Sequence, residues 1–151
     1  MTAVLVSLIA VAGTLLGSFS TFLFQQRTAR RAEAVAAAER RRQERLTAYS
    51  DFAAALTELR RAVVTVWLRR EDPAARKEAH AEADRLGALA GAALFRMRLV
   101  SGRPEPLADA AFALIDPLSE AADLPDLKTR ETAFETALSA FIASAAERLS
   151  R

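Results

Sequence analysis

A long uncharged stretch at the start of the chain constrains its fold more than any other feature. None of the 22 residues from position 3 to position 24 has a charged side chain. As an α-helix this stretch would be about 33 Å long, which matches a bilayer hydrocarbon core of about 30 Å. Arg27, Arg30 and Arg31 follow it closely. Because arginine and lysine are enriched on the cytoplasmic side of a membrane span, the sequence predicts a single-pass transmembrane anchor over residues 1–25, with the N-terminus outside the cell membrane and the C-terminal domain in the cytoplasm.

Two other interpretations of this stretch stay open. A cleaved signal peptide would have basic residues before its apolar part and a small-x-small site at the end. Here no basic side chain precedes the stretch, and the small-x-small tripeptide Ala10-Val11-Ala12 lies in its middle. A buried helix of a soluble protein would need neighbours on every side, and a chain of 151 residues supplies few of them. The anchor is therefore the preferred interpretation.

The predicted anchor carries small residues at a spacing that favours close helix pairing. Gly13 and Gly17 form a GxxxG pattern, and Thr21 extends it by one more turn. Small residues spaced by four let two helices approach closely in lipid. We therefore interpret Gly13, Gly17 and Thr21 as a candidate transmembrane face of a homodimer.

No proline or glycine occurs between Ser18 and Asp72, so nothing in the sequence interrupts a helix that begins in the anchor. Such a helix would extend over about 68 residues. Residues 26–45 form a basic juxtamembrane neck within it. Residues 27–70 carry 11 arginines against 5 acidic residues, whereas residues 71–151 carry 10 basic against 14 acidic residues. The charge is thus divided between a basic neck and an acidic distal part.

The arginines of the neck fall into two clusters. Arg27, Arg30 and Arg31 lie close enough to the predicted interface to contact anionic lipid. The second cluster consists of Arg40, Arg41, Arg42 and Arg45. On a helix perpendicular to the membrane it would begin about 24 Å from the interface, which is several Debye lengths of about 8 Å. Either the neck bends onto the membrane, or this cluster contacts another partner such as nucleic acid, or it is a solvated face paired with Glu39 and Glu44.

Residues 46–151 show the periodicity of an all-α cytoplasmic bundle of about four helices. Apolar residues recur every three or four positions, which marks one face of an amphipathic helix. In the first segment, about residues 44–70, they are Leu46, Tyr49, Phe52, Leu56, Leu59, Val63, Val66 and Trp67. In the second, about residues 73–101, they are Ala79, Ala83, Leu86, Ala90, Ala93, Met97 and Val100, broadened by Leu89, Leu94, Phe95 and Leu99. In the last two they are Leu107, Ala111, Leu114, Ile115 and Leu118, and then Phe134, Leu138, Phe141, Ala145 and Leu149 with Ile142 beside them.

Prolines and one glycine mark the breaks between these segments. Asp72-Pro73 combines a good N-cap with the residue preferred at the first helical position. Residues 101–106 have the composition of a loop, and Leu124-Pro125-Asp126 predicts a turn. Asp116-Pro117 falls inside the third segment and predicts a kink or a split there. Short connections of this kind favour an antiparallel, up-down helical bundle.

The residue types favour binding over catalysis. The chain has no cysteine and a single histidine, His80, whose only neighbour suited to metal binding at helical spacing is Asp84. No nucleotide-binding, nucleophile-elbow or zinc-protease pattern occurs. We therefore expect no cofactor, no metal and no enzymatic activity. The preferred function is a membrane-anchored helical interaction or scaffold protein whose partners are the lipid bilayer, an unidentified protein and, in a homodimer, a second copy of the chain. Two alternatives stay open: a binder of DNA or anionic lipid through the arginine neck, and a small-molecule-binding bundle.

Part of the predicted anchor, the neck and the first amphipathic helix resemble a group of short actinobacterial proteins with one N-terminal span and a helical remainder rich in alanine and arginine. The residues that carry the resemblance are "VAGTLLGSFSTFLFQQRTARRAEA" and, after a short interval, "ERRRQERLTAYSDFAAALTELRRAVVTVWLR". Some members carry the name KilB. The resemblance covers mainly the first half of the chain, and the second half agrees in helical character. It implies an accessory role in conjugative DNA transfer or in plasmid spread between cells, and it brings no catalytic residues with it.

Overall fold

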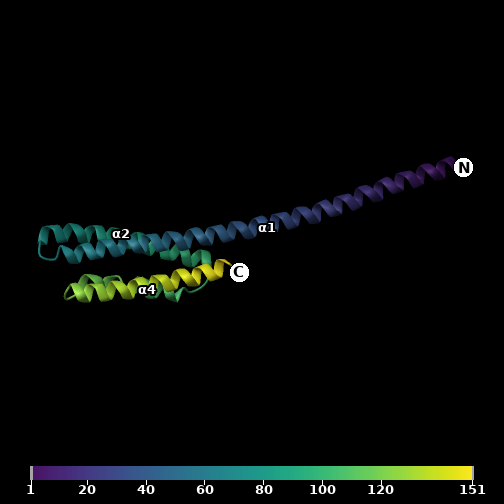
Figure 1. Ribbon diagram of the computed structural model, residues 1–151. Helices are drawn as coiled ribbons and strands as arrows, with labels where there is room; N and C mark the ends of the chain where they lie inside the picture. The colour runs from purple at the N-terminus through teal and green to yellow at the C-terminus, as the bar shows by residue number, and fades with distance from the viewer. Residues whose placement is uncertain (1, 151) are drawn as a thin grey trace. The chain divides into compact units, whose positions relative to one another are not determined.

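A computed structural model of the protein describes the backbone of residues 2–150 and the side chains of residues 29–150. Helix α1 (Thr2–Leu68) is followed by α2 (Pro73–Ser101), α3 (Pro106–Ala113), the 3-10 helix η1 (Asp116–Glu120) and α4 (Leu124–Leu149), as Figure 1 shows. The backbone of residues 2–150 contains no strand. The all-α class and the four principal helices are therefore confirmed.

The chain divides into two compact units, residues 1–41 and residues 42–151. In the first unit, the predicted anchor over residues 1–25, the small-residue face of Gly13, Gly17 and Thr21, and Arg27 lie outside the part whose side chains are described. Within the described part, no helix has an apolar run of the length that a bilayer crossing requires. The 67-residue extent of α1 agrees with the uninterrupted helix that the absence of proline and glycine predicts.

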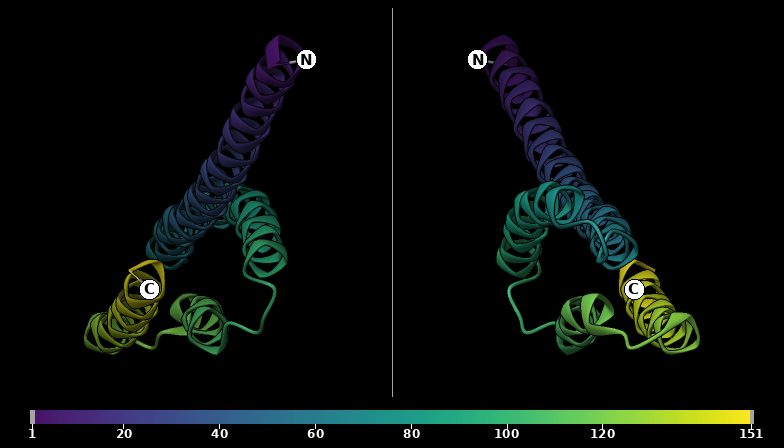
Figure 2. Two further views of the ribbon diagram at one scale, coloured as in Figure 1. Left: turned by 90° about the vertical axis from the view of Figure 1, so that its right-hand side faces the viewer. Right: turned by 90° about the vertical axis from the view of Figure 1, so that its left-hand side faces the viewer.

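The second unit is an antiparallel bundle of four segments. Viewed along its length, the second part of α1, then α2, the α3–η1 segment and α4 occupy four corners around a common core (Figure 2). Contacts between residues distant in sequence fix the directions. The ring of Tyr49 lies 5.9 Å from that of Phe141, while Trp67, at the other end of α1, bonds Ala121 just before α4. Helix α4 therefore runs antiparallel to α1, and the predicted up-down topology is confirmed.

The core is built by the large residues of α1 and α4 packed against the small residues of α2. Phe52 is 0% exposed, and its ring meets Phe141 edge to face at a centroid distance of 5.4 Å. On α2 the buried residues are mainly alanines, Ala79, Ala83 and Ala90, which let the neighbouring helix approach closely. The buried face of α1 contains every member of the predicted stripe except Leu46.

Several residues assigned to apolar faces are exposed instead. Leu99 is 83% exposed and Phe95 is 64% exposed, so the broadened face predicted for α2 is wrong at these positions. At about 100° per residue, Leu99 lies half a turn away from the buried Ala90, and no helix covers that side. Four further residues of the predicted faces are exposed: Leu46, Leu89, Leu107 and Ile142. Leu46 and Ile142 lie near the end of the bundle, where α2 and α4 stop and leave the face of α1 partly open.

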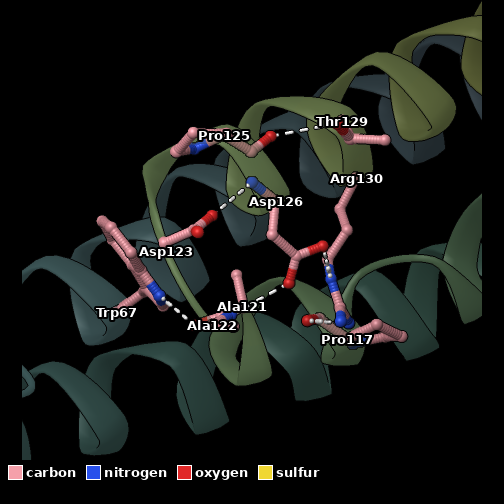
Figure 3. A network of polar contacts seen from close by, with 9 residues as sticks. All are labelled: Trp67, Pro117, Ala121, Ala122, Asp123, Pro125, Asp126, Thr129 and Arg130. Atoms are coloured by element: carbon pink, nitrogen blue, oxygen red, sulfur yellow. Dashed lines mark hydrogen bonds and ion pairs between the residues drawn. The ribbon is translucent and has the colours of Figure 1, made fainter.

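The predicted break at Asp116-Pro117 is a split. Helix α3 ends at Ala113, and the chain continues in the 3-10 helix η1. Figure 3 shows how the turn after η1 is fixed. Trp67 donates from Nε1 to the carbonyl of Ala121 at 2.6 Å. The carboxylate of Asp126 accepts a hydrogen bond from the Ala122 amide at 2.9 Å. Arg130 donates from Nη1 to the carbonyl of Pro117 at 2.9 Å.

Asp126 makes the turn sensitive to acid. The hydrogen bond from Arg130 and that from the Ala122 amide lower the pKa of Asp126 below its ordinary value. A carboxylate whose folded-state pKa is lowered stabilises the fold above its unfolded pKa of about 4, and this contribution is lost as the pH falls through the folded-state pKa. We expect Asp126→Asn to be less stable than the natural chain at pH 7 and to lose less stability on acidification.

The measurement is urea denaturation of the full chain at pH 7 and pH 3.5, followed by the fluorescence of Trp67, which is the single tryptophan. Asp84→Asn is the matched control, because Asp84 is exposed on α2 and forms no ion pair with the described side chains. Equal acid sensitivity in Asp126→Asn and in the natural chain would contradict the assignment.

Candidate functional site

The neck arginines with described side chains are free of intramolecular partners within the described part of the chain. Arg30, Arg31, Arg40 and Arg41 belong to the first unit and are exposed on α1. Arg42 and Arg45 begin the second unit and are exposed as well. None of the six forms an ion pair with a side chain of residues 29–150, so Glu39 and Glu44 do not neutralise them there.

Arg45 belongs to a pocket at the end of the bundle where α2 and α4 terminate. The pocket has a volume of about 320 Å³. It is lined by Arg45 and Tyr49 of α1, Ser101 and Arg103 near the end of α2, and Arg148 and Leu149 of α4. Three helices and one loop thus bring three guanidinium groups together. Of these, sequence reasoning identified only Arg45 as a site residue.

A buried carboxylate organises this pocket. Glu105 is 1% exposed, and it is the one charged residue buried among residues 29–150. Its Oε1 accepts a hydrogen bond from the Tyr49 hydroxyl at 2.9 Å and lies 3.6 Å from Nε of Arg103, while its Oε2 accepts from Nη1 of Arg148. A buried carboxylate is tolerated only when it is paired and hydrogen-bonded, and here both oxygens have partners. Glu105 therefore ties α1 and α4 to the start of α3.

The local sequence explains why Glu105 is held at this place. Gly102 closes α2 with a φ of 66°, in the left-handed region that glycine adopts without strain. Pro106 occupies the first turn of α3, so the chain turns from one helix to the next within the four residues between them. Glu105 is the last of these four residues and directly precedes α3.

The pocket carries an excess of positive charge. Arg103 and Arg148 pair with the one carboxylate, Glu105, and Arg45 adds a third guanidinium to the lining of the pocket. The hydrogen bond with Glu105, together with that of Tyr49, raises the pKa of Arg148 above its already high ordinary value, so Arg148 is charged at every physiological pH. Arg45 forms no ion pair with the described residues, and the Arg103 side chain is 51% exposed. The pocket therefore attracts anions.

Sequence reasoning missed Glu105, Arg103 and Arg148. Tyr49 and Glu105 are 56 positions apart, and Glu105 and Arg148 are 43 positions apart. A glutamate between two prolines resembles an exposed loop residue, and no periodicity connects it to α1 or α4. Only the assembled bundle brings these residues into contact.

A second groove contains the single histidine. It has a volume of about 420 Å³ and is lined by His80, Asp84 and Gly87 of α2, apolar residues of α1, and Asp116 and Glu120 of η1. His80 itself is exposed. Residues 29–150 contain no cluster of three or more side chains arranged to hold a metal ion. The groove is therefore an acidic-rimmed surface depression.

Comparison with known proteins gives one match. The family model described as "KilB plasmid transfer protein" matches residues 46–149, which is the bundle from the end of the neck to the end of α4. No curated protein and no solved structure matches the chain. The sequence resemblance covers mainly the first half of the chain, whereas the family match runs from residue 46 through the second half and does not include residues 1–45.

Proposed function

Since the chain belongs to the family of KilB plasmid transfer proteins, we propose that it is a helical accessory protein of conjugative plasmid transfer, held at the cell membrane by residues 1–25 and acting without catalysis by binding another transfer protein. The observation that carries this proposal is the family match over residues 46–149, because it includes every helix of the bundle.

Support for the membrane attachment comes from the sequence. The 22 uncharged residues at positions 3–24 are long enough to cross a bilayer, and basic residues follow them on one side only. The bundle then lies in the cytoplasm, where DNA and the cytoplasmic parts of a transfer apparatus are accessible. Pairing of two copies through Gly13, Gly17 and Thr21 belongs to the same proposal.

Support for a binding role comes from the bundle. Helix α2 exposes large apolar residues, Leu89, Phe95 and Leu99, along its outer side. Exposed apolar residues that gather on one helix favour contact with another protein.

Photo-crosslinking in living cells tests this proposal. A photoreactive amino acid replaces Phe95 or Leu99 in the full chain, and in the control it replaces Lys77, which is exposed near the start of α2. We expect Phe95 and Leu99 to yield an adduct with a plasmid-encoded protein in cells that carry the conjugative plasmid. The absence of an adduct at both positions, with stable expression of the chain, would overturn the proposed interaction.

A second candidate function rests on the unpaired arginines. Arg40, Arg41 and Arg42 are exposed and form no ion pair with the described side chains, so they could neutralise phosphates of DNA. Each phosphate contact contributes about 0.9 to the slope of log affinity against log salt concentration for duplex DNA. If the neck binds DNA, the full-length protein with all three arginines changed to alanine shows a slope smaller by about 2–3 in a fluorescence-anisotropy titration. Equal slopes for the two proteins would exclude this candidate.

A further inference from the structure

An apolar groove lies beside the arginine pocket, between α1 and α4. Its volume is about 350 Å³, and its walls include Leu46 and Ala53 of α1 and Phe141, Ile142 and Leu149 of α4. Leu46 and Ile142 are 45% and 49% exposed, respectively. The groove therefore presents apolar surface that the bundle itself leaves uncovered.

The groove and the arginine pocket are neighbours that share two lining residues, Tyr49 and Leu149. The Tyr49 ring packs against Phe141, which lines the groove, while its hydroxyl donates to Glu105, which organises the arginine pocket. The apolar groove and the cationic pocket thus adjoin at Tyr49 and Leu149.

We propose that this combined site binds an anionic amphiphile, a molecule with an acidic carboxylate or phosphate head and a single apolar chain. The head lies at Arg45, which forms no ion pair with the described residues, and beside Arg103, whose half-exposed guanidinium is only 3.6 Å from Glu105 at its Nε and keeps its other nitrogens free of that carboxylate. The chain lies in the groove along Leu46 and Ile142, where it removes their exposed surface from water. Charge complementarity selects an anionic head, because three guanidinium groups face one carboxylate. Each of the two volumes is near the lower end of the range of small-molecule sites, about 300–1,000 Å³, which suits one chain and one head group.

This site is independent of the proposed role in plasmid transfer. The transfer partner is expected on the outer side of α2, whereas the amphiphile lies between α1 and α4. Failure of one proposal therefore leaves the other standing.

The single tyrosine provides a direct probe. Because Tyr49 is the only tyrosine of the chain, incorporation of 3-fluorotyrosine places one fluorine nucleus where the groove and the pocket meet. The full chain is placed in nanodiscs of zwitterionic phosphatidylcholine and titrated with monodecyl phosphate. We expect a saturable change in the fluorine chemical shift. Decyltrimethylammonium, which has the same chain and the opposite charge, and inorganic phosphate, which has no chain, are expected to leave the shift unchanged at equal concentration.

Two variants locate the binding, each with a matched control. Arg45→Gln removes a head-group partner, and Ile142→Asn removes an apolar wall; both residues are exposed, so the bundle should remain folded. Each variant is expected to raise the half-saturating concentration of monodecyl phosphate about tenfold. Arg76→Gln on α2 and Leu124→Asn at the start of α4 change an exposed arginine and an exposed aliphatic residue outside the site and are expected to leave it unchanged.

A further experiment distinguishes a bilayer lipid from a free acid as the ligand. If only the added monodecyl phosphate produces the saturated shift, the ligand is a free single-chain acid, as proposed. If phosphatidylglycerol included in the nanodisc produces the saturated shift by itself, the site accepts a two-chain bilayer lipid and the single-chain proposal is overturned. The proposal is overturned if monodecyl phosphate gives no saturable change in the fluorine shift, or if Arg45→Gln binds monodecyl phosphate as well as the natural chain does. It is also overturned if the shift depends on protein concentration alone, because that result would show that a second copy covers the groove.

Discussion

Truncation of Phe52 to alanine should lower the free energy of unfolding of the bundle by about 3–5 kcal/mol. The Phe52 side chain is 0% exposed, and it contacts the Phe141 ring at a centroid distance of 5.4 Å. Removing the ring loses the free energy of transferring it from water into the core. It also leaves a cavity between α1 and α4, because the surrounding close-packed side chains relax only partially into the space. For a domain of this size the loss is a large part of the total stability.

Phe95→Ala is the matched control, since it removes the same side chain from a position on α2 that is 64% exposed. It should change the free energy of unfolding by no more than about 0.5 kcal/mol. Urea denaturation of the full chain, followed by Trp67 fluorescence, measures both variants. Similar losses in the two would contradict the assignment of Phe52 to the core and of Phe95 to the outer face.

Replacing Arg148 with methionine should have the second largest effect. Glu105 is 1% exposed, and Arg148 donates to its Oε2. Breaking a buried ion pair by removing one partner costs about 3–5 kcal/mol, because the other charge stays buried without compensation. The Arg148 side chain is 28% exposed in a pocket that opens to solvent, so we expect a smaller loss of about 2–3 kcal/mol.

A second substitution separates charge from packing. Glu105→Gln removes the buried charge but keeps an oxygen that accepts from the Tyr49 hydroxyl. In combination with Arg148→Met it should restore most of the lost stability. Arg85→Met, which breaks the exposed pair with Glu82, is the control and should change stability little. If the double variant were less stable than Arg148→Met alone, the loss would come from packing and not from an uncompensated charge.

The periodicity of the sequence was sufficient to predict the class, the helix number and the antiparallel topology. Apolar residues at a spacing of three or four identify the face of α1 from Tyr49 to Trp67 because that face is covered along its whole length. The proline-based breaks were correct for a similar reason: a proline at the start of α2, α3 and α4 removes a hydrogen-bond donor whatever surrounds it.

The periodicity was insufficient where coverage depends on the neighbouring helices. Leu99 and Phe95 extend an apolar pattern on α2, yet only the arrangement of the bundle decides that no helix lies over them. The arginine pocket could not be predicted for the same reason. Arg45, Glu105 and Arg148 lie on α1, on the loop before α3 and on α4, and no local signal relates residues so distant along the chain.

The frequency of plasmid transfer, measured with and without the proposed anchor, tests the central claim most directly. In the bacterium that encodes the chain, a deletion of its gene is complemented either by the full chain or by a chain that lacks residues 2–24, with equal protein levels confirmed by immunoblot. We predict that the full chain restores conjugative transfer and that the shortened chain, although it accumulates, does not. Normal transfer in the uncomplemented deletion would contradict a role in transfer, and full restoration by the shortened chain would contradict membrane attachment as a requirement for it.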